Sequence, residues 1–176
     1  MYIFGGETSE TLSDLWEYSF DSEEWSLLEM TNNTRSHQGM VIDSNNILWI
    51  YGGQTSPFVV TEDLISLDLG NPDSMWHIEG NYSSDTFEHP DARSRMSMIE
   101  YDEDYLLVFG GELQSGSVST EIWLFLKRNG TWERRSDIAG LYPNGVSRHK
   151  MVKNEDNEIF VFGGYESFSK TCYYNN

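Results

Sequence analysis

The sequence predicts an all-β protein assembled from a repeated unit, and three observations carry this prediction. An apolar run ends in a pair of glycines four times in 176 residues, with neighbouring pairs about 50 residues apart, the spacing of a repeated supersecondary unit. Aromatic residues make up 14% of the chain while only 4 prolines interrupt it, which favours sheet over helix. A tryptophan follows three of the pairs. The pairs are Gly5–Gly6, Gly52–Gly53, Gly110–Gly111 and Gly163–Gly164, and the tryptophans are Trp25, Trp76 and Trp132.

Each unit reads as two successive hairpins. The first strand starts near a methionine and ends in an acidic or Asn-rich turn, and the second strand runs into the glycine pair. The methionines are Met40, Met98 and Met151. A third strand, as in residues 14–20 or 121–126, leads to a turn rich in Asp, Asn and Gly, and the fourth strand starts at the tryptophan. Period-2 runs joined by such turns predict antiparallel strands.

A four-stranded sheet of this kind cannot bury its own faces, so the units are expected to stack side by side. Paired glycines at a strand end permit positive φ and let a neighbouring backbone approach where a Cβ would clash. The tryptophan offers a large apolar contact to the adjacent sheet. Radial stacking of four-stranded sheets predicts a β-propeller.

The glycine pairs, the tryptophans that follow them and the upstream Arg148 resemble kelch repeats of the galactose-oxidase type of β-propeller. The resemblance covers almost the whole chain. Kelch units often carry histidine three residues after the arginine, whereas the three methionines stand at that place here. His37 stands where an arginine is expected, although Arg35 is close by. These departures weigh against borrowing the function of any particular kelch subfamily.

The repeat divides residues 1–176 into a single partial kelch β-propeller of about half a ring, with two complete four-stranded blades flanked by two incomplete ones. The expected units are an incomplete blade with strands 2–4 (1–30), full blades (35–79 and 93–135), an incomplete blade with strands 1–2 (147–165) and a tail (166–176). The resemblance implies about six blades in a closed ring. We therefore expect the chain to be a fragment, with the remaining blades of a longer chain needed to close it.

The longer loops are expected on one rim of the propeller, over residues 7–13, 54–62, 80–93, 112–120 and 136–147. Loops on a rigid scaffold commonly carry binding sites, and the resemblance favours this rim as well. The candidate partner-binding residues are Phe58, Phe87, Tyr142, Arg35, Arg95 and Arg148. The alternative is that the aromatic rings pack into neighbouring blades and that the arginines bind loop carbonyls and acids. The opposite rim collects acidic turns that include Asp43 and Asp102.

Composition excludes several classes of partner. The net charge of −18 repels phosphate backbones, so no nucleic acid is expected to bind. No apolar stretch approaches the roughly 20 residues of a bilayer span, so no membrane insertion is expected. The single cysteine, Cys172, excludes an internal disulfide framework and favours a cytoplasmic location. Three glycosylation sequons, at Asn32, Asn81 and Asn129, keep an extracellular location as the alternative.

The sequence shows no catalytic constellation. His37, His77, His89 and His149 are scattered without metal-ligand spacing, and neither a nucleophile elbow nor a phosphate-binding loop occurs. We therefore expect no enzyme, no metal and no cofactor. The predicted function is a non-catalytic scaffold that binds a protein partner through the long-loop rim. The alternative is a fragment of a galactose-oxidase-type catalytic or carbohydrate-binding propeller whose active residues lie outside this chain.

Overall fold

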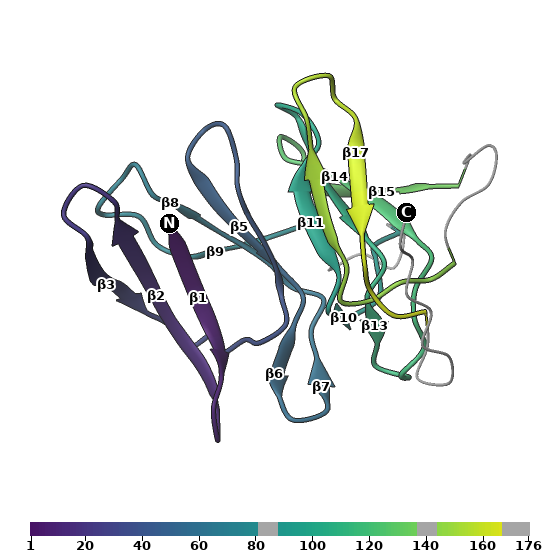
Figure 1. Ribbon diagram of the computed structural model, residues 1–176, viewed down its shortest axis with the longest axis horizontal. Coiled ribbons are helices and arrows are strands. Elements are labelled where there is room, and N and C mark those ends of the chain that lie inside the picture. Colours follow the sequence, from purple (N-terminus) through teal and green to yellow (C-terminus); the bar gives the residue numbers. More distant parts are fainter. Residues whose placement is uncertain (81–87, 137–143, 167–176) are drawn as a thin grey trace.

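The computed structural model describes residues 1–80, 88–136 and 144–166, and in this part the chain is all-β. Four antiparallel sheets follow one another along the chain, and each keeps its strands in sequence order (Figure 1). Blade 1 holds β1 (Tyr2–Glu7), β2 (Thr11–Ser19) and β3 (Glu24–Met30); blade 2 holds β4 (Gly39–Ile42), β5 (Ile47–Tyr51), β8 (Leu64–Asp68) and β9 (His77–Glu79); blade 3 holds β11 (Ser97–Glu100), β12 (Tyr105–Phe109), β14 (Ile122–Leu126) and β15 (Thr131–Arg135); blade 4 holds β16 (Lys150–Lys153) and β17 (Ile159–Phe162). The predicted fold class is confirmed: a partial propeller with two complete four-stranded blades between two incomplete ones.

Two short sheets occur in segments where only loops were expected. They pair β6 (Gln54–Ser56) with β7 (Val59–Val60), and β10 (Arg93–Ser94) with β13 (Glu112–Leu113). Figure 1 shows β6 and β7 below the blades, with β10 and β13 to their right. Residues 54–56 are polar and show no apolar alternation, so periodicity carries no signal for this hairpin. The pairing of β6 with β7 therefore follows from the tertiary arrangement and not from a pattern in the sequence.

The tryptophans hold neighbouring blades together. The Trp76 ring lies 5.2 Å from Phe4 of blade 1, and the Trp132 ring lies 5.1 Å from Tyr51 of blade 2. Phe4 and Tyr51 each stand directly before a glycine pair. The same contact therefore recurs at both interfaces: the tryptophan of one blade packs on the last aromatic residue of the second strand in the preceding blade.

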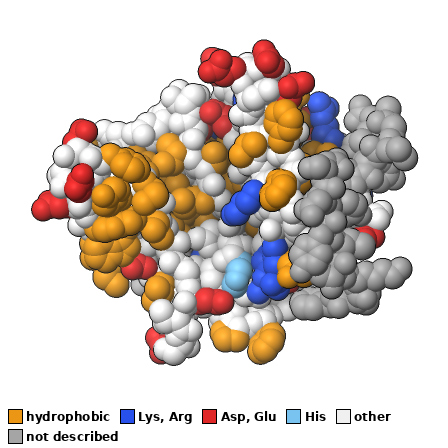
Figure 2. Space-filling view, in the orientation of Figure 1, with side chains coloured by type: hydrophobic (Ala, Val, Ile, Leu, Met, Phe, Trp, Pro, Cys, Tyr) orange, Lys and Arg blue, Asp and Glu red, His pale blue; other side chains and the backbone are white. Residues whose placement is uncertain are grey.

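Each end of the partial ring exposes one half of this recurring contact. Within the described residues no other blade covers Trp25 of blade 1, which is 45% exposed, and Phe162 of blade 4 occupies the position of Phe4 and Tyr51 yet is 72% exposed. Figure 2 shows hydrophobic side chains gathered over blade 1, where Ile3 and Leu27 are also exposed. An apolar surface of this kind marks an interaction surface rather than a solvated face.

The glycine pairs lie where the backbones of adjacent blades meet. Gly110 has a φ of 68°, and a Cβ there would overlap the carbonyl oxygen of Val146 in the next blade. The N–H of Gly111 donates to that same oxygen at 2.9 Å. The arrangement recurs at two other interfaces, where Gly6 donates to Arg35 O at 2.8 Å and Gly53 donates to Arg93 O at 2.9 Å. Glycine is therefore required at these points by both steric contact and backbone conformation.

His149 is a buried titratable group at the interface between blades 3 and 4. Its side chain is 1% exposed, its ring packs edge-on against Phe109 with centroids 5.2 Å apart, and neither ring nitrogen has a hydrogen-bond partner. Burial, with a smaller contribution from the charge of Lys150, lowers the pKa of His149 to about 4. The imidazole is therefore neutral at pH 7.

This depressed pKa predicts a pH dependence of stability. Unfolded His149 titrates at its ordinary pKa of 6.5, so its contribution is complete above that pH and is lost as the pH falls toward the folded pKa. Between pH 7 and pH 4 we expect the chain to lose about 3 kcal/mol more unfolding free energy than a His149→Leu variant. Urea titrations of both proteins across this range measure the difference. Equal losses in the two proteins would contradict the assignment.

Candidate partner-binding rim

The long-loop rim is defined here as the face formed by residues 7–11, 54–62 and 112–120 together with the segments that enter blades 2, 3 and 4. Three equivalent residues line its inner side, namely His37, Arg95 and Arg148, with φ of 58°, 57° and 60°. Their backbones are linked, because Arg95 N donates to His37 O at 2.8 Å and Arg148 N donates to Arg95 O at 2.7 Å. Positive φ at non-glycine residues is uncommon. Its recurrence in three blades makes it a feature of the architecture.

The two arginines of this row share one carboxylate. Arg95 Nη1 lies 2.8 Å from Glu112 Oε2, and Arg148 Nε lies 3.4 Å from Glu112 Oε1. The guanidinium of Arg148 also lies 5.3 Å from the centroid of the Tyr165 ring. The predicted residues Arg95 and Arg148 are thus brought together, and both are held by Glu112. Arg148 is the more exposed of the two.

His37 closes the row beside blade 1. Its Nε2 lies 3.8 Å from Glu7 Oε1. Burial and then the charge of Arg95 lower the pKa of His37, and these effects outweigh the opposing effect of Glu7. The imidazole is therefore neutral at pH 7, so it leaves the charge of Glu7 uncompensated.

Arg35, predicted for the rim surface, lies in the interior instead. Its side chain is 1% exposed, and Nη1 donates to Gly52 O at 2.9 Å and to Asp63 O at 3.1 Å. Arg93 occupies the equivalent place in blade 3 and donates to Gly110 O at 3.2 Å. The repeat therefore places its arginine at Arg35 in blade 2 and at Arg93 in blade 3. Val146 occupies the equivalent position in blade 4. The sequence repeat predicts this arginine at His37, Arg95 and Arg148, which lie only two residues further along.

Phe58 is presented to solvent at the tip of the β6–β7 hairpin. It is 87% exposed, so the alternative in which its ring packs into a neighbouring blade does not describe the structure. Its φ of 69° is an unusual conformation for a bulky residue. The other two aromatic candidates, Phe87 and Tyr142, lie outside the described residues.

Gln114, from the loop of blade 3, holds this hairpin in place. Its Nε2 donates to Phe58 O at 2.7 Å, and its Oε1 accepts from Val60 N at 3.0 Å. A side-chain amide that makes both bonds fixes the tip across two blades. Sequence reasoning missed Gln114, because a lone glutamine in a polar loop shows no pattern and only the fold brings it beside Phe58.

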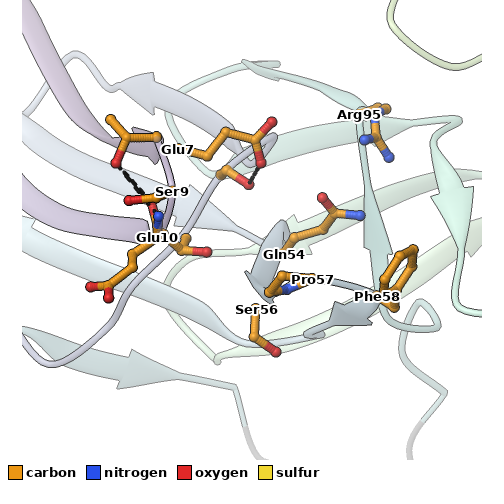
Figure 3. Close-up of a pocket in the computed structure, with 11 residues that line it drawn as sticks. Glu7, Ser9, Glu10, Gln54, Ser56, Pro57, Phe58 and Arg95 are labelled. Carbon is orange, nitrogen blue, oxygen red and sulfur yellow. Dashed lines mark hydrogen bonds between the residues drawn. The ribbon is translucent and has the colours of Figure 1, made fainter.

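A pocket of about 240 Å³ lies between the β1–β2 and β6–β7 hairpins (Figure 3). Glu7 and Ser9 contribute one side, Ser56 and Phe58 the other, and Arg95 stands at its inner end. Ser36 Oγ, which also lines the pocket, donates to Glu7 Oε2 at 3.2 Å. The pocket combines one apolar wall with several hydroxyl groups, the carboxylates of Glu7 and Glu10 and the guanidinium of Arg95.

On the opposite rim, some acidic side chains form ion pairs that join neighbouring blades. Lys127 Nζ lies 3.1 Å from Asp43 Oδ2 and 3.0 Å from Glu100 Oε1, which joins blades 2 and 3. Asp43 is buried and also accepts from Trp49 Nε1 at 2.9 Å. Asp43, which the sequence predicted on the acidic rim, is therefore an interior residue. Others, including Asp102, remain at turns.

Two further properties bear on function. Among residues 1–80, 88–136 and 144–166, no three His, Cys, Asp or Glu side chains are grouped so that they could hold a metal ion. In the same part of the chain, no helix has the length and apolar character that a membrane crossing requires. Cys172 lies outside the described residues.

Comparison with known proteins agrees with this architecture. The structure titled "Structure of YjhT" superimposes with a TM-score of 0.68 at 20% identity, over 89% of this chain and 46% of that one. The tRNA wybutosine-synthesizing protein 4 of Candida albicans is 32% identical over 82 residues, which span 47% of this chain and 11% of the relative. The chain thus covers about half of the matched structure and a small part of the curated relative.

The family model described as the KLHDC2/KLHL20/DRC7 Kelch-repeats domain matches residues 1–176. This match extends over all four blades, including the glycine pairs and tryptophans at which the blades pack. The match supports a propeller that serves as a protein-interaction module. The chain belongs to the KLHDC2/KLHL20/DRC7 Kelch-repeats domain family.

Proposed function

We propose that the chain is part of a non-catalytic scaffold that binds a protein partner through the long-loop rim. The single observation that carries this proposal is the presentation of Phe58, an aromatic side chain held out to solvent by Gln114 of the next blade. Exposed aromatic residues on a rigid support are typical interface anchors, because little conformational entropy is lost when they bind. Arg148, on the inner side of the same rim, supplies a charged side chain that is 44% exposed.

The test compares two exposed phenylalanines on opposite rims. Phe58→Ser is expected to reduce partner recovery in an affinity pull-down by ten-fold or more, the order of a hot-spot loss of about 2 kcal/mol. Phe20→Ser is the matched control: Phe20 is 72% exposed and lies in the turn between β2 and β3 on the other rim. Equal recovery with both variants and the unaltered chain would contradict the proposal.

The end faces bear on the partners of this module. We propose that further blades of a longer polypeptide cover them, since Trp25 and Phe162 carry the two unmatched halves of the contact that joins the described blades. Such blades would pack an aromatic residue on Trp25 and a tryptophan on Phe162.

A second candidate is a propeller that belongs to an enzyme. The observation in its favour is the curated relative, whose name describes a protein that synthesises wybutosine in tRNA. In this case the active residues would lie in other blades or domains. Metal analysis and activity assays of a protein that contains the whole propeller would distinguish the two, because a scaffold retains partner binding without either property.

A further inference from the structure

The pocket beside Phe58 has the size of a side-chain site. Its volume of about 240 Å³ is below the roughly 300–1,000 Å³ of sites for drug-sized molecules and cofactors. Two hairpins from different blades form its walls (Figure 3). A single long side chain of a bound protein would therefore fill it, which suits the function proposed above and depends on it.

The carboxylate of Glu7 gives this pocket its charge. Its Oε2 accepts from Ser36 Oγ at 3.2 Å, and its Oε1 lies 3.8 Å from Nε2 of the neutral imidazole of His37. Figure 3 shows the Glu7 carboxylate turned toward the interior of the site, whereas that of Glu10 points away from Phe58. Glu7 thus offers an accessible anionic oxygen.

One guanidinium, that of Arg95, also lines the pocket, and its charge acts near Glu7, because it lowers the pKa of His37. Arg95 forms its short ion pair with Glu112, at 2.8 Å and largely buried. The charge of Arg95 is thereby paired with Glu112, and the pocket lining adds two carboxylates, Glu7 and Glu10. The whole chain adds a net charge of −18, which steers cationic groups toward its surface. Charge complementarity therefore favours a basic occupant.

The wall opposite Glu7 suits the rest of a long basic side chain. Pro57 and the exposed ring of Phe58 provide an apolar surface, and Gln114 fixes its position. A guanidinium is more weakly hydrated than an ammonium and stacks on aromatic faces, and it also binds carboxylates with two donors. These properties select arginine over lysine.

We propose that the pocket between the β1–β2 and β6–β7 hairpins binds an arginine side chain of the partner protein. Its guanidinium binds the Glu7 carboxylate, and its stem lies against Pro57 and Phe58. The hydroxyl groups of Ser9 and Ser56 stand at the same pocket and can accept further hydrogen bonds from the guanidinium.

The probe is N-acetyl-arginine methylamide, titrated into the whole ¹⁵N-labelled chain and followed by amide chemical shifts. Saturable shifts are expected at Glu7, Ser56 and Phe58, with weaker binding at higher salt. N-acetyl-norleucine methylamide and N-acetyl-aspartate methylamide should bind more weakly at these positions. Absence of saturable shifts with the arginine probe, or tighter binding of the aspartate probe, would overturn the proposal.

Two charge-matched variants locate the site. Glu7→Gln is expected to weaken the arginine probe by about five-fold, the upper range for an exposed ion pair. Glu23→Gln removes the same charge from the opposite rim and should leave binding unchanged. If both variants weaken binding equally, the effect comes from net charge and the assignment to Glu7 is wrong.

The outcome is separable from the proposed function. If Phe58→Ser abolishes partner recovery but the arginine probe does not bind, the rim remains the interface and the arginine site is rejected. If the probe binds with the expected pattern while Phe58→Ser leaves recovery unchanged, the pocket binds arginine, but its assignment to the partner and the function proposed for the rim both fall.

Discussion

Replacement of Arg93 by methionine is expected to lower the unfolding free energy by about 3–5 kcal/mol, the usual cost of removing one partner of a buried ion pair. Arg93 is fully buried, and its Nη2 lies 2.8 Å from Glu121 Oε2. The same guanidinium donates to Gly110 O and to Ser119 Oγ, at 3.2 and 3.0 Å. Methionine would remove the charged donor from all three acceptors, although Glu121 would keep its contacts with Arg134 and Trp123.

Arg134, the second arginine that pairs with Glu121, provides a matched control. Its Oε1 also lies 3.1 Å from Arg134 Nη2, whose side chain is half exposed. Arg134→Met should therefore cost about 0.5 kcal/mol or less, as is usual for surface pairs. Adding Glu121→Gln to Arg93→Met should restore about 1–2 kcal/mol, since a carboxylate that has lost its buried partner is removed. Similar losses for Arg93→Met and Arg134→Met would contradict this account.

These measurements are best made by urea unfolding at pH 7. Burial raises the pKa of the Glu121 carboxyl, but hydrogen bonds from Arg93 and Trp123 outweigh this effect and hold that pKa below its ordinary value of 4.5. A depressed carboxyl pKa stabilises the fold fully above the unfolded value, and this stabilisation is lost as the pH falls through the folded one. At pH 7 the full contribution is present.

Trp132→Ala should cost about 3 kcal/mol, because the indole fills the interface between blades 2 and 3. Its ring lies 5.1 Å from Tyr51 and 5.0 Å from Phe125. Its loss would leave a cavity beside side chains that are themselves fully buried. Unfolding free energy from urea titration measures the effect.

Trp25→Ala is the matched control, since it removes the same side chain from the equivalent strand of blade 1. With 45% of Trp25 exposed and no preceding blade packed on it, the cost should be about 1 kcal/mol. If Trp25→Ala is as costly as Trp132→Ala, then the tryptophans stabilise their own blades and the contact between blades is not the source of stability. A longer protein in which another blade covers Trp25 should show the larger value.

The blades were predictable from the sequence because the contacts between them are encoded locally. A glycine pair marks the point where two backbones meet, and a tryptophan marks the ring that packs on the preceding blade, so both recur with the fold. The register of the arginine was not predictable by spacing, since Arg93 and Arg95 lie two residues apart. Only the buried acceptors Gly110 O and Glu121 distinguish them.

The candidate site was predictable only in part. Phe58 could be found because it lies in a short apolar run, residues 57–60, within an otherwise polar loop, and the structure exposes it. The β6–β7 hairpin and its contact with Gln114 could not be found, because they join loops of different blades through one amide. The same applies to the pocket, which requires Glu7 of blade 1 to lie beside the hairpin of blade 2.

Photo-crosslinking from position 58 tests the proposed interface most directly. A photoreactive phenylalanine analogue, such as benzoylphenylalanine, is placed at Phe58 or, in a second protein, at Phe20, and each chain is irradiated with cell extract. A specific adduct from position 58 alone, competed by the unaltered chain, is the predicted result. An adduct of the same partner from position 20, with none from position 58, would show that the partner binds the opposite rim and would contradict the account.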